Sequence, residues 1–332
     1  VRAPDDCISA HANQSRIHQF DMSDKDNCMY SPDVISFARE KGYFDGVNKD
    51  FSFAKAYAPL DFGARRYCEA RVWSYFNMFT ARGNEFLPYI LGDTDTPMPL
   101  FVKPDRKISV QDVKNAMRDH YEGTPLDISK DFGAGPYHTP YRLSPLSFKV
   151  NDQEYFNERP ISTQQSGFVF VSQMRSSMPD AIGGVLWFGT DDANMTVFTP
   201  VYCCTDKVPV CYSRVDGADY ITFSWNSSFW IFNWVANMVY PRYDLMIEDV
   251  RASQSEMETT FNDAQEGIES AASKLYAKDP AQAKAFLTNY TNMTAQSTLD
   301  TWKRLGEFLI VKYNDGVVKR MKDGKFERNS IG

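Results

Sequence analysis

The sequence predicts an α+β protein in which helices come before and after a buried antiparallel β-sheet. Three observations support this: helical periodicity before residue 122, three short β-rich runs between 166 and 200, and long amphipathic helices after 220. The turns between the β-rich runs are too short for parallel crossovers, which argues against a doubly wound nucleotide-binding sheet. A sheet covered on both faces, by helices or by a second sheet, satisfies this order of elements.

The first helices are predicted from their ends and their apolar faces. Residues 31–33 (Ser-Pro-Asp) are typical of a helix start, with Ser31 as the cap, and Gly42 is expected to end that helix. Residues 64–79 carry a second apolar face at helical spacing. A third helix is predicted over 109–121, where Asp112 follows Ser109 by three positions.

The middle of the chain changes character twice. Residues 122–160 are rich in Gly and Pro and predict an irregular stretch, which in a compact protein is either functional or a surface wrap. Strands are then predicted at 166–172, 184–189 and 195–200 as an antiparallel meander. Their continuous apolar character predicts burial on both faces.

The last third of the chain is expected to be helical. An aromatic, buried helix is predicted over 223–240. The stripes over 243–277 and from Pro280 to Leu309 predict an αα-hairpin. Glycines at 316 and 324 predict turns in the tail.

Composition limits the class of protein. The chain has 332 residues, with 36 Lys plus Arg against 43 Asp plus Glu, a net charge of −7. This acidic balance argues against a nucleic-acid binder, and 43% hydrophobic residues argue against disorder. The longest apolar run, 229–240, is interrupted by Asn233 and Asn237. It is shorter than the roughly 20 residues of a membrane span, so none is expected.

The cysteines show no metal-binding spacing. Six are present, without a C-x-x-C pair. Cys203, Cys204 and Cys211 are close in sequence. They are compatible either with a disulfide between two of them or with three buried thiols. Five N-x-S/T sequons would matter in a glycosylating host. The compartment is left open, with export to the periplasm or the cell exterior favoured.

Two segments carry polar groups suited to catalysis. No G-x-S-x-G is present, and no histidine has a third ligand at metal-binding spacing, so neither a serine hydrolase, a metal nor another cofactor is expected. Asn13 can offer a side-chain N–H to an oxyanion, although Asn is also common in plain turns. The arginines of 63–73 can orient a carboxylate or lower a thiol pKa, unless they form a solvated helix face.

Several motifs, in this order, resemble one family. They are Val1–Asp6 with His11–Gln14, Arg118–Pro125, Arg159–Gln165, Gly183–Phe188, Thr199–Cys203 and Val208–Tyr212. Together they are similar to cysteine dipeptidases of the acidic dipeptidase A type, in the N-terminal-nucleophile hydrolase superfamily. The resemblance covers nearly the whole chain.

The resemblance implies a four-layer αββα fold, here partial with its first strands missing, and an added C-terminal helical hairpin. It also implies an N-terminal Cys nucleophile whose own α-amino group acts as the base, with a thioacyl intermediate. By position, Asn13 corresponds to the family's oxyanion-assisting Asn, with His11 as the alternative. Arg71 corresponds to an arginine near the active centre, with Arg65 as second choice.

The chain departs from the family at its first residue. Val1 is not a nucleophile, so the chain is expected to be the carboxyl-terminal two-thirds of the enzyme and inactive alone. Residues 1–220 are then the remainder of the hydrolase domain, with the loop 122–160 and strands at 166–202, and 221–332 a helical region packing on it. An upstream segment of the same precursor is an expected partner.

The functional hypothesis is hydrolysis of dipeptides or short peptides by a cysteine-type peptidase. A related amide hydrolase, acting on acyl amino acids or bile-salt-type conjugates, is the near alternative, because one fold hosts several activities. The distant alternative is a non-catalytic peptide- or sugar-binding protein, suggested by Trp187, Trp225, Trp230 and Trp234. The expected ligand is a small peptide and no nucleic acid, and homo-oligomerisation is left open.

Overall fold

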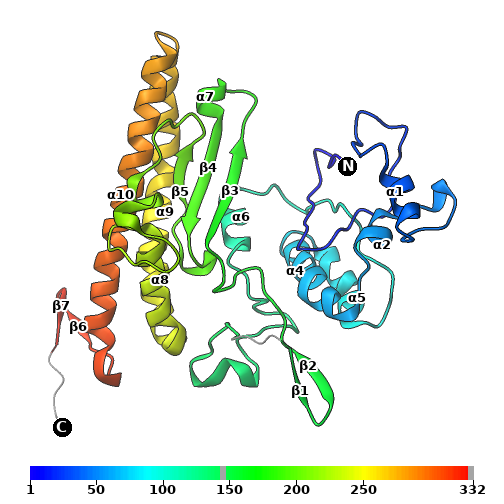
Figure 1. Cartoon of the computed structure of the whole chain (residues 1–332). Helices are drawn as coiled ribbons and strands as arrows, with labels where there is room; N and C mark the ends of the chain where they lie inside the picture. Colours follow the sequence, from blue (N-terminus) through cyan, green and yellow to red (C-terminus); the bar gives the residue numbers. More distant parts are fainter. Residues whose placement is uncertain (143–146, 328–332) are drawn as a thin grey trace. The chain divides into compact units, whose positions relative to one another are not determined.

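The computed structural model describes residues 1–142 and 147–327 (Figure 1). Two compact units make up the chain. Unit 1 comprises Val1–Asp112, Asp119–Asp127 and Arg142–Ile161, and unit 2 comprises Val113–Arg118, Ile128–Tyr141 and Ser162–Gly332. Unit 2 thus contains elements from both sides of residue 220, and the domain division at that residue stays a prediction.

Unit 1 is built from short helices and one hairpin. Its helices, with α6 continuing into unit 2, are α1 Val34–Glu40, α2 Phe53–Tyr57, α3 Phe62–Ala64, α4 Ala70–Phe79, α5 Leu87–Leu91 and α6 Val110–Ala116. A π-helical turn, Arg65–Glu69, joins α3 to α4, and 3-10 turns lie at Asn48–Asp50 and Ala81–Phe86. The helix predicted over 64–79 is therefore confirmed, with the π turn inside it.

The first helix begins later than predicted. Helix α1 starts at Val34, its N-cap residue is Asp33, and no side chain caps it. Ser31 does not cap the helix because its hydroxyl donates a hydrogen bond to the Asp33 carboxylate instead. The predicted end is confirmed, since Gly42 follows the helix with φ +72°.

The third predicted helix starts as expected but ends early. Ser109 and Asp112 form a reciprocal capping box, with Asp112 N donating to Ser109 Oγ (3.1 Å) and Ser109 N donating to Asp112 Oδ2 (2.8 Å). Helix α6 ends at Ala116 rather than continuing to Tyr121. Tyr121 has φ +65°, which no right-handed helix accommodates, and its hydroxyl donates to the Arg159 carbonyl (2.7 Å).

The stretch 122–160, predicted to be irregular, contains a hairpin that the prediction missed. Strands β1 (Ser147–Val150) and β2 (Gln153–Phe156) pair antiparallel around Asn151 and Asp152, both in the left-handed region. Two such residues between strands make a type I′ turn, so the signal was present in the sequence. A 3-10 segment at Phe132–Tyr137 also falls in this stretch, and residues 143–146 of it lie outside the described residues.

Unit 2 has an antiparallel meander beside long helices (Figure 1). Strands β3 (Phe168–Met174), β4 (Gly184–Thr190) and β5 (Thr199–Tyr202) pair in the order β3-β4-β5, as predicted. The third strand begins at Thr199 rather than at residue 195, because Ala193–Met195 forms a 3-10 turn closed by the Asp192 carboxylate. A short helix, α7 (Asp180–Gly183), connects β3 to β4.

The two faces of this sheet differ within the described residues, so the predicted burial on both faces is not found for β3. One face carries Trp187 and Tyr202, both buried, and Tyr202 Oη donates to Glu269 Oε1 of α9 (3.2 Å). On the other face of β3, Phe168, Phe170 and Met174 are 62%, 49% and 61% exposed. Successive side chains of β3 point to opposite faces of the sheet, and only those on one of these faces are buried among the described residues. A continuous apolar run in the sequence therefore does not mean that both faces of the strand are buried.

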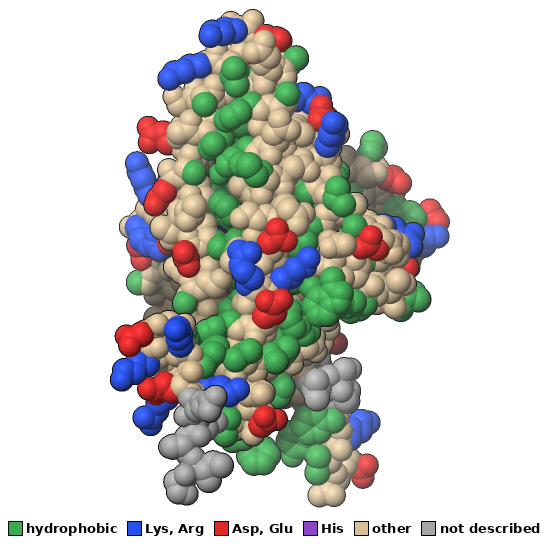
Figure 2. Space-filling view, turned by 90° about the vertical axis from the view of Figure 1, so that its left-hand side faces the viewer, with side chains coloured by type: hydrophobic (Ala, Val, Ile, Leu, Met, Phe, Trp, Pro, Cys, Tyr) green, Lys and Arg blue, Asp and Glu red, His purple; other side chains and the backbone are tan. Residues whose placement is uncertain are grey.

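The predicted αα-hairpin is confirmed. Helices α9 (Tyr243–Tyr276) and α10 (Pro280–Tyr313) run antiparallel, and the Asp279 carboxylate caps α10 (Figure 1). Helix α8 (Ser228–Val239) packs on α10, where Phe232 and Trp302 stack with ring centroids 4.6 Å apart. Figure 2, which views the side of α10, shows acidic and basic side chains interspersed with apolar ones.

Helix α8 starts at Ser228 rather than at residue 223. The preceding loop is held by Asp216, whose carboxylate accepts from Ser224 Oγ (2.7 Å) and Asn226 Nδ2 (2.9 Å). As a result Phe223 and Trp225 are 46% and 54% exposed, contrary to the expected burial. Within the described residues no helix combines the length and apolarity that a bilayer crossing requires.

The described tail after α10 has turns at Gly316 and Gly324, as predicted, and also a small hairpin. A 3-10 turn at Asn314–Gly316 follows the helix directly. Strands β6 (Met321–Lys322) and β7 (Lys325–Phe326) then form a small hairpin around Gly324, which has φ +73°. The remaining short 3-10 turns of unit 2 lie at Val210–Tyr212, Val215–Gly217 and Tyr240–Arg242.

Candidate active site

Asn13 lies at a bend in the first segment of unit 1 and is exposed. Its φ of +57° is in the left-handed region, which Asn tolerates better than most residues. Nearby, Ile8 forms an isolated antiparallel bridge with Val102, which anchors the segment. The chain therefore bends at Asn13.

Arg71 contacts Asn13 directly. It lies in the first turn of α4, directly after the π turn, and its Nη2 donates to Asn13 Oδ1 (2.9 Å). The same guanidinium donates through Nε to the Tyr67 carbonyl (2.7 Å), which holds the arginine against its own helix. Single π turns inside helices are frequent at functional sites because they change the direction of the following side chains.

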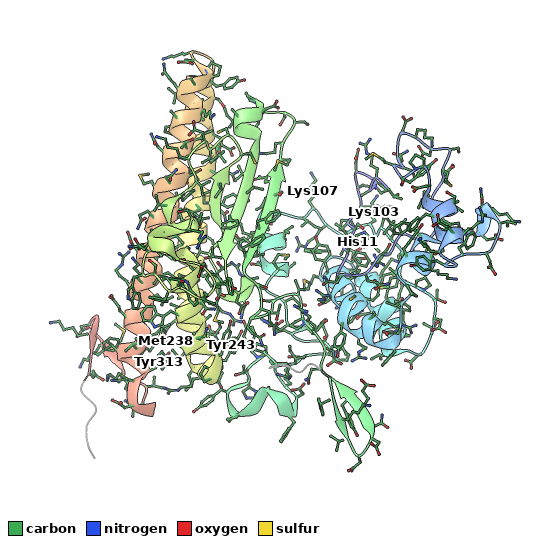
Figure 3. The ribbon with its side chains drawn as sticks, viewed as in Figure 1. His11, Lys103, Lys107, Met238, Tyr243 and Tyr313 are labelled. Atoms are coloured by element: carbon green, nitrogen blue, oxygen red, sulfur yellow. The ribbon has the colours of Figure 1, made fainter. Side chains whose placement is uncertain are left out.

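The two alternative residues differ in their surroundings: Arg65 is engaged with another segment, whereas His11 lies in the same segment as Asn13. Arg65 donates to the carbonyls of Tyr89 and Thr94 (3.3 and 3.2 Å) and to Asp95 (2.8 Å), so its guanidinium is used by the segment 89–95. His11 is exposed, on a segment that Figure 3 shows close to Lys103. Partial burial lowers the pKa of His11, and the nearby Arg16 charge lowers it further.

A buried ion pair of unit 1 was missed by the sequence analysis. Arg16 and Glu69 are each 4% exposed, and Arg16 Nε donates to Glu69 Oε2 (3.0 Å). Both residues line a cavity of about 580 Å³ in unit 1. Arg16 follows Asn13 by three positions and Glu69 precedes Arg71 by two, but neither belongs to a motif that would have marked it.

Asp119, also in unit 1, is a second buried carboxyl group. It accepts a hydrogen bond from Ser74 Oγ (2.7 Å) and is 8% exposed. Burial raises its pKa to about 6, and the nearby Glu122 carboxylate adds to this, while the Ser74 hydrogen bond opposes it.

The cysteines are free thiols throughout the described chain. Cys203 is exposed and Cys211 is buried, and the structure shows no disulfide among Cys203, Cys204 and Cys211. Burial raises the pKa of all three, that of Cys211 to about 11, which disfavours the reactive thiolate. Among the residues that the structure describes, no cluster of three His, Cys, Asp or Glu could hold a metal ion.

Comparison with known proteins gives a consistent result. The model of peptidase family C69 matches residues 1–256. A probable dipeptidase of Salmonella dublin is 33% identical over 202 residues, which are 61% of this chain and 41% of that protein. A probable dipeptidase of Latilactobacillus sakei is 28% identical over 193 residues, 57% of this chain and 35% of that protein.

A third relative matches a larger share of the chain. Dipeptidase A of Lactobacillus helveticus is 23% identical over 232 residues, 69% of this chain and 42% of that protein. The chain therefore spans less than half the length of the curated relatives that it matches.

Proposed function

Because the chain belongs to peptidase family C69, we propose that it is part of a dipeptidase that hydrolyses dipeptides or short peptides. The similarity to proteins named dipeptidase supports this substrate class. The observation that carries the proposal is the hydrogen bond between Arg71 and Asn13, the two residues that the family resemblance places near the reaction.

Asn13 has the right chemistry to stabilise an oxyanion. An arginine can only donate, so the Asn13 amide must turn its oxygen toward Arg71 and its Nδ2–H₂ away from it. The amide nitrogen is then the donor available to a developing negative charge on a peptide carbonyl. Asn13 is exposed, so a substrate can reach it without displacing packed side chains.

Arg71 acts as a positioning residue in this proposal. Its bond to Asn13 Oδ1 prevents the amide from flipping, which would present an acceptor oxygen to the oxyanion. Its positive charge also favours a nearby thiolate. The nucleophile is proposed to be an N-terminal cysteine, which attacks the peptide carbonyl, expels the amine after proton transfer from its own α-ammonium group, and is released by water.

The four-layer αββα fold is proposed with this mechanism. The apolar face of β3 with Phe168, Phe170 and Met174 supports it, because the described residues leave that face exposed. A second sheet packed on it would bury these side chains in the way that stacked sheets do.

The test is dipeptide hydrolysis by the complete gene product that contains residues 1–332. We expect turnover of dipeptides with free termini and its loss when the N-terminal Cys is replaced by Ala. Asn13→Ala should lower kcat about 100- to 1,000-fold with little change in KM, as for loss of one oxyanion donor. Arg71→Met should also lower kcat, and Arg71→Lys should restore part of it, because a lysine also donates to Asn13 Oδ1.

Arg82→Met is the matched control, since Arg82 is an exposed arginine of the same unit that pairs only with Glu85 in the described chain. Unchanged kcat in Asn13→Ala would remove Asn13 from the mechanism. Preference for acyl amino acids or bile-salt-type amides over dipeptides would indicate the related amide hydrolase. Sugar binding by the complete protein without any turnover would contradict enzymatic function.

A further inference from the structure

One cavity of unit 1 is lined by neither Asn13 nor Arg71. It has a volume of about 580 Å³, which is within the range of small-ligand sites. Its wall combines the segment after Asn13, the region of α2, and the π turn before Arg71. Gln14 and Glu69 belong to this wall. Gln14 directly follows Asn13, and Glu69 precedes Arg71 by two positions, so residues next in sequence to both members of the proposed pair line the cavity.

Glu69 is an unusual wall residue, because its carboxylate is only half satisfied. Oε2 accepts from Arg16 Nε, whereas Oε1 is buried and has no hydrogen-bond partner among the described residues. A buried charged oxygen without a donor is costly, and a ligand donor would remove that cost. The terminal torsion of a glutamate is soft, so a small rotation can present Oε1 to a ligand.

Arg16 does not supply the missing donor. Its Nη1 donates to the Ala10 carbonyl (3.2 Å), and its Nη2 donates to the carbonyls of Met98 and Pro99 (3.2 and 3.0 Å). The guanidinium is therefore held by backbone on three sides while it pairs with Glu69. Oε1 of Glu69 therefore has no donor within the described residues and can accept from a ligand.

The cavity also contains a cation that is not paired. Lys55 is an exposed residue of the cavity lining, and its ammonium makes no ion pair within the part of the chain that the structure describes. Arg65, by contrast, is paired with Asp95. Besides the exposed carboxylates of Asp50 and Asp95, the lining thus offers a buried carboxylate oxygen of Glu69 and the ammonium group of Lys55 to a ligand that carries both charges.

We propose that this cavity binds the free termini of a short peptide, with Glu69 accepting from the α-ammonium group and Lys55 pairing with the carboxylate. The proposal rests on the proposed function and names the feature of the substrate that is recognised. A charged ammonium is favoured over a neutral donor because hydrogen bonds between ionised groups are the stronger ones.

The test compares ligands that differ in one terminus. The probe is alanyl-N-methylalanine, whose methylated peptide bond resists hydrolysis, together with its N-acetylated and its C-terminal amide forms. Binding to the 332-residue chain is measured by isothermal titration calorimetry. We expect the free dipeptide to bind at least about tenfold more tightly than either blocked form.

Variants assign each preference to a residue. Glu69→Gln keeps an acceptor for Arg16 and should abolish the preference for the free amine over the acetylated form. Lys55→Met should abolish the preference for the acid over the amide, and Lys49→Met, a surface lysine outside the cavity lining, should change neither.

Equal binding of all three ligands by the wild-type chain, or absence of binding, would overturn the inference without any variant, so it stays testable even where Glu69→Gln does not fold. A preference for free termini that survives both Glu69→Gln and Lys55→Met would also overturn it. Failure of the proposed function is distinct, because it appears as absent turnover in the complete gene product while binding here persists.

Discussion

At the scale of single residues, each of the two units buries a titratable side chain, and burial disfavours its charged form. Asp119 in unit 1 and Lys114 in unit 2 are 8% and 0% exposed. Burial raises the pKa of the Asp119 carboxyl to about 6 and lowers that of the Lys114 ammonium to about 8. The two residues should therefore change the pH dependence of stability in opposite directions.

Replacing Asp119 by Asn should stabilise the protein at neutral pH. The folded-state pKa is above the unfolded value, so the folded form holds the proton more tightly and wild-type stability falls as pH rises from about 4 to about 6. Asp119→Asn removes this loss and keeps an acceptor for Ser74, which predicts a gain of up to about 3 kcal/mol at pH 7.5 and much less at pH 4.

The measurement is urea unfolding at both pH values. Asp93→Asn, an exposed aspartate of the same unit, is the control and should change stability little at either pH. A gain from Asp119→Asn that does not grow with pH would show that the buried carboxylate is not destabilising.

Replacing Lys114 by Met should also stabilise the protein at pH 7. Nζ of Lys114 lies 3.5 Å from the Trp187 ring centroid and 3.1 Å from Asn262 Oδ1. Burial outweighs the attraction of Glu258, so the folded-state pKa is below the unfolded one and wild-type stability rises as pH increases from about 8 to 10.5. We expect a gain of about 1–2 kcal/mol at pH 7, after loss of the cation–π contact, that shrinks at pH 9.5.

Urea unfolding at pH 7 and 9.5 measures this difference. Lys278→Met in the exposed turn between α9 and α10 serves as the control and should give nearly equal values at both pH values. Destabilisation by Lys114→Met at pH 7 would mean that the contact with Trp187 exceeds the cost of burying the charge.

At the scale of elements, the close packing of α8 on α10 depends on one glycine. A Cβ atom added to Gly306 would lie 2.2 Å from Trp234 Cζ3, whereas one added to Gly267 on α9 would meet nothing within 4 Å. Gly306→Ala should therefore destabilise the protein by about 1–3 kcal/mol through overpacking. Gly267→Ala should stabilise it by about 0.5–1 kcal/mol, because alanine has the higher helix propensity.

Thermal unfolding of both variants tests the packing of this helix pair. Since both substitutions are Gly→Ala in long helices, propensity alone predicts the same sign for both. Only the position of Trp234 predicts opposite signs, so a stabilised Gly306→Ala protein would show that α8 and α10 do not approach as closely as described.

At the scale of the whole molecule, contacts distant in sequence hold unit 2 together. Glu258 of α9 is 3% exposed, and its carboxylate accepts from both terminal nitrogens of Arg118 (2.6 and 3.2 Å) and from Phe198 N (2.8 Å). The Glu258 side chain thereby connects α9 to Arg118, two residues after the end of α6, and to Phe198, the residue before β5.

Breaking this pair should be costly. Glu258→Ala removes the carboxylate from the Arg118 guanidinium, whose side chain is only 13% exposed, and we expect a loss of about 3–5 kcal/mol. The double variant Arg118→Met/Glu258→Met should recover much of it, because both charges are removed together. Urea unfolding of the single and double variants forms the cycle, and additive losses would show that the two residues act independently.

The sequence could predict contacts between residues that are close along the chain, but not contacts between distant residues. The capping box of Ser109 and Asp112 is separated by three residues and was predictable. The pairing of Arg16 with Glu69, 53 residues apart, was not, because no local pattern reports which distant side chains meet. Asn13 and Arg71 were selected through a family resemblance. Their hydrogen bond could not be predicted from the local sequence of either segment.

By itself, the sequence determined the type of most elements: the helices around 34–40 and 64–79, the three-stranded meander and the αα-hairpin. These follow from periodicity, caps and turns, which are properties of neighbouring residues. Only the tertiary structure decided that β3 exposes Phe168 and Phe170, and that Glu69 keeps an unpaired oxygen in a cavity wall. Burial and pairing depend on which elements pack together, and that is determined by contacts between segments distant in the chain.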